Sequence, residues 1–228
     1  MSQPVILLAC RIFEGSIQNL LPAQNFQTVE FFDYGLHTFP KKLNSAVQNW
    51  LDSLPEPSRV ILGYGLCGNG LANIQAGRHT LVIPKADDCI AILMGSRQRY
   101  RKEFDEHPGT YYLSKGWLEI GSDPLGQYET LLKKYDSETT NWLMDQQFQH
   151  YRRLVFVAQH VSEFDHYRIR IRQVAEYCSR WGMTYEEMLG SEEFIIQLLE
   201  TANSMPRVAD QFIIVQPGET LLPAYFTE

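Results

Sequence analysis

Short apolar runs alternate with helical patterns along almost the whole chain. Runs rich in β-forming residues predict strands at Val5–Ala9, Thr28–Tyr34, Val60–Leu62, Thr80–Pro84, Thr110–Leu113, Leu154–Ala158 and Phe212–Val215. Helical spacing of apolar residues predicts helices at Arg11–Leu21, Lys41–Leu54, Ile90–Met94, Gln127–Gln149, Tyr167–Trp181 and Phe194–Ala202, with a short one near Leu71–Gln75. This alternation predicts an α/β fold, with a mostly parallel sheet and helices on both of its faces.

The length of the chain limits its domain organisation. Its 228 residues suit one large domain or two small ones, and 44% apolar content is enough for a sizeable core. We therefore expect a single α/β domain over residues 1–228. Residues 122–127 are the candidate boundary if the chain divides into two lobes.

Charge and hydropathy argue against several classes of partner. The net charge of −7 provides no basic footprint for nucleic acid or an anionic membrane. The basic run Arg97–Lys102 fits a solvated helix face. We see neither a signal peptide nor an apolar run of the ~18 residues that a membrane span needs. Because the four cysteines lack the regular spacing of a disulfide framework, we expect a reducing, cytoplasmic location.

Residues Arg59–Gly70 combine a buried strand with a glycine-rich loop around Cys67. Glycines this dense end regular strand pairing and let the backbone pass close to another group. They stand at Gly63, Gly65, Gly68 and Gly70. We expect Gly65, Gly68 and Gly70 to bring backbone N–H groups close to a bound thiolate or substrate.

Three cysteines share one setting in the predicted fold. Cys10, Cys67 and Cys89 each lie at or just beyond the carboxyl end of a predicted strand, and His37 follows another strand. Because such ends share one edge of a parallel sheet, the side chains could converge there as ligands of zinc or of a [4Fe-4S] cluster. Inert buried cysteines, or a reactive thiol beside a base, are the competing interpretations. Cys178 lies within a helix and is expected to pack in the core.

Two other features of this region suggest chemistry. The spacing from Gly63 to Gly68 is that of a G-x-G-x-x-G dinucleotide fingerprint, with Asp87 and Asp88 about twenty residues later. The helix expected after it is short, and a cysteine is unusual inside the motif. Asp88, next to Cys89, is a candidate catalytic group that handles protons, although a solvated loop carboxylate is the simpler interpretation.

The motifs together resemble a known family. H-x-x-P-x-x-L from His37, YGLCGNG, DDCIAILMGS and GTYYLSKGW are similar to the uncharacterised prokaryotic domain-of-unknown-function family 1638. Some relatives resemble companions of corrinoid- and thiol-dependent methyl transfer systems. The resemblance therefore implies a thiolate metal site and a corrinoid-protein partner. The matching positions are Cys10, His37, Cys67 and Cys89.

These observations lead to one main hypothesis and two alternatives. The main hypothesis is a cytoplasmic protein that binds zinc or an iron–sulfur cluster through cysteines and acts on a small-molecule substrate. It would be a metal-dependent methyltransferase or a thiol-activating enzyme. The first alternative is a non-catalytic accessory or binding protein with a structural metal or none, and the second is a dinucleotide-binding enzyme. A closed set of four ligands would favour a structural metal, whereas an open position would favour catalysis.

Overall fold

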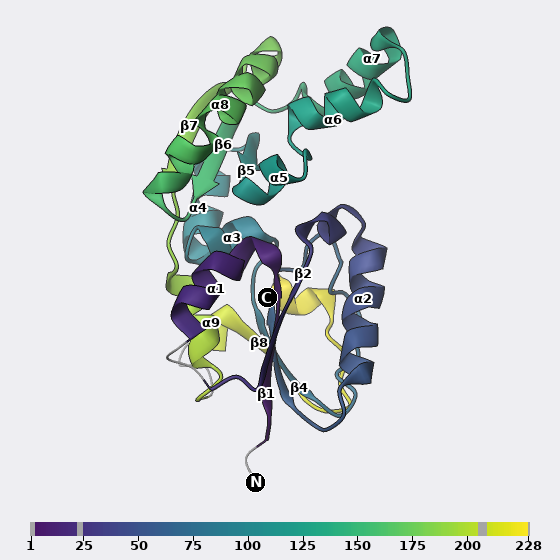
Figure 1. The fold of residues 1–228 in the computed structure, drawn as a ribbon, viewed down its shortest axis with the longest axis vertical. Coiled ribbons are helices and arrows are strands. Elements are labelled where there is room, and N and C mark those ends of the chain that lie inside the picture. The colour runs from purple at the N-terminus through teal and green to yellow at the C-terminus, as the bar shows by residue number, and fades with distance from the viewer. Residues whose placement is uncertain (1–2, 22–24, 205–208, 228) are drawn as a thin grey trace. The chain divides into compact units, whose positions relative to one another are not determined.

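The computed structural model describes residues 3–21, 25–204 and 209–227. The chain folds into two compact units (Figure 1). The first consists of Met1–Arg97 together with Glu192–Glu228, and the second of Gln98–Ser191. Residues 122–127, where the sequence suggested a division into lobes, lie inside the second unit. In the part of the chain that the structure describes, no helix combines the length and the apolar character needed to cross a membrane.

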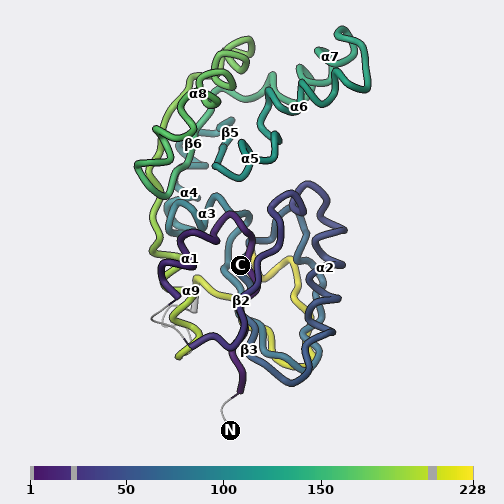
Figure 2. The backbone as a smooth tube through the Cα atoms, viewed as in Figure 1, coloured from purple at the N-terminus to yellow at the C-terminus, as the bar shows by residue number. Residues whose placement is uncertain are grey.

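The first unit contains a five-stranded sheet. Its strands, in spatial order, are β2 (Thr28–Phe32), β1 (Val5–Cys10), β3 (Arg59–Gly63), β4 (Thr80–Pro84) and β8 (Phe212–Val215). The first four are parallel, and β8 pairs antiparallel with β4. Figure 2 shows the C-terminal segment, in yellow, returning to the N-terminal part of the chain. The mostly parallel α/β sheet predicted from the sequence is confirmed.

The chain changes direction in this sheet between β1 and β3. From β1 it moves to β2 on one side, and it then crosses to β3 on the other side of β1. In open α/β sheets, the carboxyl ends of the strands at such a switch point border the crevice in which ligands bind. The carboxyl ends of β1 and β3 are therefore the first place to look for a site.

Helices cover both faces of this sheet, as the sequence predicted (Figure 1). Helix α2 (Pro40–Ser53) lies on one face and buries Leu43, Val47 and Leu51, which are spaced by one helical turn. Helices α1 (Glu14–Leu20) and α9 (Glu193–Glu200) lie on the other face. The other helical segments that the structure describes in this unit are η1 (Arg11–Phe13), η3 (Tyr34–Thr38), α3 (Cys89–Leu93), η5 (Ala209–Gln211) and η6 (Pro223–Phe226).

The prediction of a short helix near Leu71–Gln75 is wrong. This segment forms turns, followed by an isolated bridge between Gln75 and Thr220. Asn73 has a left-handed backbone with φ 62°, which cannot continue a right-handed helix. The side chain of Asn44 donates hydrogen bonds to the carbonyl groups of Gly70 and Ala72, and it thereby holds the turns against α2.

The second unit contains a three-stranded parallel sheet in the order β5 (Thr110–Leu113), β6 (Arg153–Ala158), β7 (Thr184–Leu189). Its helical segments are α4 (Arg97–Glu106), α5 (Lys115–Glu119), α6 (Pro124–Leu131), α7 (Ser137–Phe148), α8 (Val161–Cys178) and η4 (Ser179–Trp181). The region expected as one helical stretch, Gln127–Gln149, is divided between α6 and α7. Strand β7 was not predicted, because its sequence TYEEML is polar and largely exposed.

A buried ion pair links two helices of the second unit. Asp123 is fully buried and caps α6 by accepting a hydrogen bond from the amide of Gly126 at 3.0 Å. Arg170 of α8 donates to both carboxylate oxygens, with Nη2 at 3.0 Å from each and Nε at 3.2 Å from Oδ2. One carboxylate therefore both caps the start of α6 and ties this helix to α8.

Candidate functional site

The loops that follow β3 and β4 run side by side at the carboxyl edge of the first sheet. The amide of Leu66 donates to the carbonyl of Ala86 at 2.9 Å, and the amide of Cys67 donates to the carbonyl of Asp87 at 3.0 Å. Cys10 is the last residue of β1, the strand next to β3. These pairings bring the chain segments that carry Cys10, Cys67 and Cys89 to one place.

Burial and neighbouring charges act on the three thiols. Burial is the main cause that raises the pKa of each thiol, to about 12 for Cys10. Cys10 raises the pKa of Cys67 further, and Cys67 and Cys10 both raise that of Cys89. Cys10 is buried, whereas Cys67 and Cys89 are partly exposed. At neutral pH the site therefore holds three protonated thiols whose deprotonated forms would repel one another.

His37 comes from a different element of the first unit. It sits in η3, beyond the end of β2, and burial lowers its pKa so that the imidazole is neutral at neutral pH. The side chains that shift the pKa values of the three thiols are the thiols themselves, Asp88, Asp33 and Arg11. Throughout the described residues, no three His, Cys, Asp or Glu side chains are placed as a metal ion would need them.

Asp88 has an observed structural role. Its Oδ1 accepts hydrogen bonds from the amides of Ile90 at 2.8 Å and Ala91 at 3.4 Å, and it thereby caps the start of α3. Its negative charge also raises the pKa values of Cys67 and Cys89. If Asp88 also transfers protons, it would have to do so while its carboxylate caps α3.

Packing accounts for two of the three glycines expected to approach a ligand. A Cβ at Gly65 would lie 2.8 Å from backbone atoms of Asp88, and one at Gly70 would lie 2.7 Å from Cδ2 of Leu43. Gly65 thus lets the loop after β3 pass directly against the residue that caps α3. The positions of Cys67 and Cys89 depend on this close approach.

Gly68 is required for a different reason. Cys67, Gly68 and Asn69 all have left-handed backbones, with φ values of 50°, 61° and 70°. The amide of Gly70 closes this turn by donating to the carbonyl of Cys67 at 3.1 Å. Left-handed conformations are strained for residues with a Cβ, except for Asn and Asp, which tolerate them. The turn therefore imposes strain at Cys67, the residue with the reactive side chain.

We expect Gly68→Ala to destabilise the turn by ~1–2 kcal/mol, because alanine resists a left-handed backbone. Gly68→Asn is the matched control and should cost less, since asparagine adopts this conformation readily. Thermal unfolding and the alkylation rate of Cys67 measure the effect. Equal stability and equal alkylation rates in the alanine and asparagine variants would mean that the left-handed backbone at residue 68 is not needed.

A groove of about 900 Å³ opens beside this turn. It lies between the start of α2 and the turn, and its walls include Phe39, Lys41, Lys42, Gly68 and Asn69. Phe39 is 55% exposed, and Nζ of Lys42 lies 4.6 Å from the centre of its ring. No acidic residue lines the groove, so its chemistry suits a neutral or anionic small molecule.

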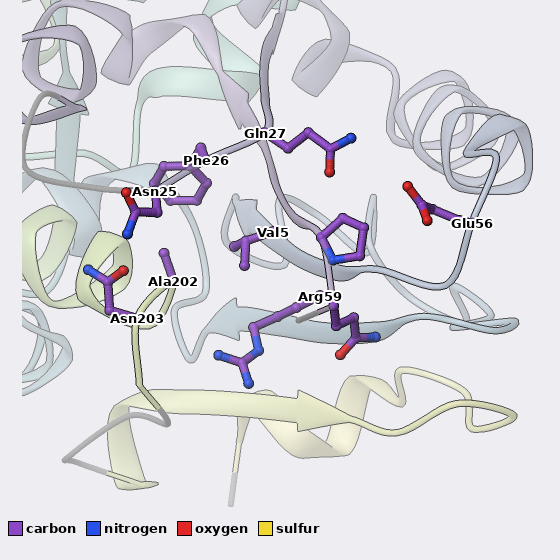
Figure 3. Close-up of a pocket in the computed structure, with 10 residues that line it drawn as sticks. Val5, Asn25, Phe26, Gln27, Glu56, Arg59, Ala202 and Asn203 are labelled. Atoms are coloured by element: carbon purple, nitrogen blue, oxygen red, sulfur yellow. The ribbon is translucent and has the colours of Figure 1, made fainter. Parts of the chain in front are cut away.

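A second pocket lies at the opposite edge of the sheet (Figure 3). It has a volume of about 780 Å³ and is lined by Val5 and Arg59, where β1 and β3 begin. The guanidinium of Arg59 donates to the carbonyl of Thr201 at 3.2 Å. Open α/β sheets bind ligands at the carboxyl ends of their strands. The pocket in Figure 3 is therefore the weaker candidate.

Tyr64 belongs to the thiol site, although the sequence did not identify it. It follows β3 directly, is 3% exposed, and has a pKa that burial and the nearby thiols Cys10 and Cys67 raise. Its place between Gly63 and Gly65, in the loop that carries Cys67, was the signal that could have found it.

Comparison with known proteins identifies a family. A family model described as "Protein of unknown function (DUF1638)" matches residues 31–199. The matched range includes His37, Cys67, Asp88 and Cys89, and it begins after Cys10. No curated protein and no solved structure matches the chain.

Proposed function

Because the chain belongs to the DUF1638 family, which is described only as proteins of unknown function, we propose a function for it from the site at the sheet edge. The proposal is a protein that binds zinc or an iron–sulfur cluster through Cys10, Cys67 and Cys89. The observation that carries it is the meeting of these three residues at one edge of the sheet, where Cys10 raises the pKa of Cys67 and both raise that of Cys89. A bound cation reverses this effect, because it stabilises thiolates that otherwise repel one another.

Metal binding at this site requires the ligands to change state. The three thiols are protonated without a metal and are not arranged as ligands. Binding would release their protons and rotate the side chains towards a common centre. The hydrogen bonds from Leu66 and Cys67 to the loop after β4 already hold two of the three segments together. Side-chain rotation would therefore be the main change.

The groove beside Cys67 suggests how the site would work on a substrate. Three cysteine ligands leave one coordination position for His37 or for a substrate atom. A metal supplies, when bound, the Lewis acidity that keeps a thiol deprotonated at neutral pH. Lys41 and Lys42 would hold an anionic small molecule in the groove, whose wall includes Gly68, the residue directly after Cys67.

Thiol-dependent methyl transfer is the reaction class that we propose for this arrangement. The electron pair of the substrate's deprotonated thiol would form the new bond to the methyl carbon, and the thiol proton would pass to the solvent. The bond between the methyl carbon and its donor would break, and its electron pair would stay on the donor. For this donor we propose a methylated corrinoid carried by a partner protein. All four cysteines are free, which supports a reducing, cytoplasmic setting for this chemistry.

Specific observations bear on the two alternatives, an accessory protein and a dinucleotide-binding enzyme. A non-catalytic accessory protein is favoured if His37 closes the coordination sphere, and the groove beside Cys67 counts against it. A dinucleotide-binding enzyme needs a helix directly after the glycine motif, to receive the phosphates at its N-terminus. Turns follow β3 instead, so this alternative has lost its main support.

We expect anaerobically purified protein to contain or take up about one zinc ion or one cluster per chain, with release of about three protons for zinc. Elemental analysis measures the metal, and calorimetry in buffers of different ionisation enthalpy measures the protons. Cys178→Ala is the control, since Cys178 is buried beside Val174 in the second unit, and its metal content should be unchanged. Wild-type protein that neither contains nor takes up metal would contradict the proposal.

A further inference from the structure

The groove beside Cys67 is already formed in the first unit without a ligand. It lies between the start of α2 and the left-handed turn that follows Cys67. The side chain of Asn44, on α2, donates to the carbonyl group of Gly70 at 3.2 Å and to that of Ala72 at 2.8 Å. These two bonds hold the walls of the groove together. A site that exists before the ligand arrives avoids the cost of ordering loops on binding.

Gly68 keeps the space between the two walls open. A Cβ at this position would lie 3.5 Å from Cγ of Pro40, the first residue of α2, so the two residues face each other across the groove. The groove has a volume of about 900 Å³, which is in the range of pockets that hold small molecules.

Two lysines give this groove a positive charge that no acidic residue balances. Lys41 and Lys42 line it, and among the described residues no Asp or Glu does so. Neither lysine forms an ion pair with any residue in the ranges 3–21, 25–204 and 209–227. The chain as a whole carries a net charge of −7, so this patch stands out from its surroundings. A concave surface with charges of one sign concentrates ions of the opposite sign.

Phe39 adds a flat apolar surface to the same groove. Its side chain is 55% exposed, and Nζ of Lys42 lies 4.6 Å from the centre of its ring. The ring and the ammonium group are therefore close enough to contact one small molecule. Aromatic rings bind other rings in offset or edge-to-face geometry. A ligand ring packed on Phe39 would bring an acidic substituent within reach of Lys42.

We propose that the groove beside Cys67 binds a flat aromatic anion, whose ring packs against Phe39 and whose carboxylate or phosphate group binds Lys41 and Lys42. This inference rests on the proposed function in taking the anion as the substrate, whereas the binding itself needs neither a metal nor a thiolate. Side-chain amides and hydroxyls in the walls would bind polar substituents of the ring. They belong to Thr38, Ser45, Asn69 and Asn73.

Naphthoate and naphthyl phosphate are the probes for this site, and the neutral naphthamide is the comparison. Chemical-shift titration of metal-free protein, followed at the amides of Gly68 and Asn69, measures each Kd and locates the binding. We expect naphthamide to bind roughly 5–10-fold more weakly than naphthoate, as the loss of two exposed charge pairs predicts. Added salt should weaken the binding of the two anions only, because exposed charges are screened. The anion with the lower Kd identifies the acidic group that the lysines prefer.

Variants of the groove test the role of each side chain. The double variant Lys41→Met, Lys42→Met keeps the apolar stems, and we expect it to bind naphthoate roughly 10-fold more weakly while its affinity for naphthamide stays unchanged. Phe39→Leu should weaken the binding of all three probes by roughly 3–10-fold, because the ring contact is lost. Lys102→Met is the matched control. Lys102 is also exposed, but it pairs with Glu106 on α4, and this variant should keep the wild-type affinities.

The outcomes for the groove and for the metal site can be told apart. Wild-type protein that binds neither anion would overturn the proposal, and so would equal affinities of the wild type, the lysine double variant and Phe39→Leu for naphthoate. These results would leave the metal site untested by them and intact, because they are obtained on metal-free protein. Groove binding as expected in a protein that takes up no metal would support the proposal and contradict the metal site.

Discussion

Cys67→Ser is expected to weaken metal binding by roughly 100-fold or more, because even the loss of a supporting group costs 10–100-fold and Cys67 would be a direct ligand. Cys67 occupies the centre of the site. It is influenced by Cys10, and it in turn acts on Cys89 and Tyr64. Serine has nearly the same size but does not provide a thiolate. Competition with a chromophoric chelator measures the affinity.

The stability of the metal-free Cys67→Ser variant is the control for this prediction. The amide of Cys67 donates to the carbonyl of Asp87, and serine keeps this bond. We therefore expect the unfolding midpoint of the metal-free variant to stay close to that of the wild type. Wild-type affinity in Cys67→Ser would show that the metal is held elsewhere, and the proposed ligand set would be wrong.

Arg170→Met should destabilise the second unit by about 3–5 kcal/mol, because it leaves the buried carboxylate of Asp123 without its counter-charge. Asp123 has no exposed surface, and Arg170 approaches both of its oxygens. Methionine retains most of the apolar stem of arginine. The loss of stability therefore reports mainly the removal of the positive charge. Urea unfolding followed by tryptophan fluorescence measures the change, since Trp117 and Trp181 both pack against the core of this unit.

Arg168→Met on the same helix is the matched control for this prediction. Arg168 pairs with Asp165 at the surface, where both side chains are largely exposed. Such pairs contribute ~1 kcal/mol or less. The double variant Asp123→Asn, Arg170→Met should regain part of the lost stability, since it leaves no buried charge. Equal losses for Arg168→Met and Arg170→Met would show that burial of the pair has no energetic consequence.

Much of the fold could be predicted because its signals are local. Pro40 suits the first turn of α2, and Leu43, Val47 and Leu51 repeat at helical spacing on its buried face. Strands buried on both faces appear in the sequence as continuous apolar runs, as Val60–Leu62 does. Their alternation with helices implied a parallel sheet and placed the three cysteines at strand ends.

Strand β7 shows what such local signals miss. Glu186 and Glu187 are poor strand formers, and the segment has no buried face. It becomes a strand because β6 offers a paired edge beside it, where Arg153 forms an ion pair with Glu186 at 2.6 Å. Tertiary pairing outweighed local preference there, as it also did in the turns that replaced the helix near Leu71–Gln75.

The sequence by itself determined the α/β class and the placement of Cys10, Cys67 and Cys89 after strands, because burial and strand direction follow from residue pattern. Only the tertiary structure decided how those thiols interact. Their pKa values, the capping role of Asp88 and the burial of Tyr64 depend on distances between segments that are far apart in the chain. Electrostatic coupling and desolvation act through space, so residue order alone does not specify them.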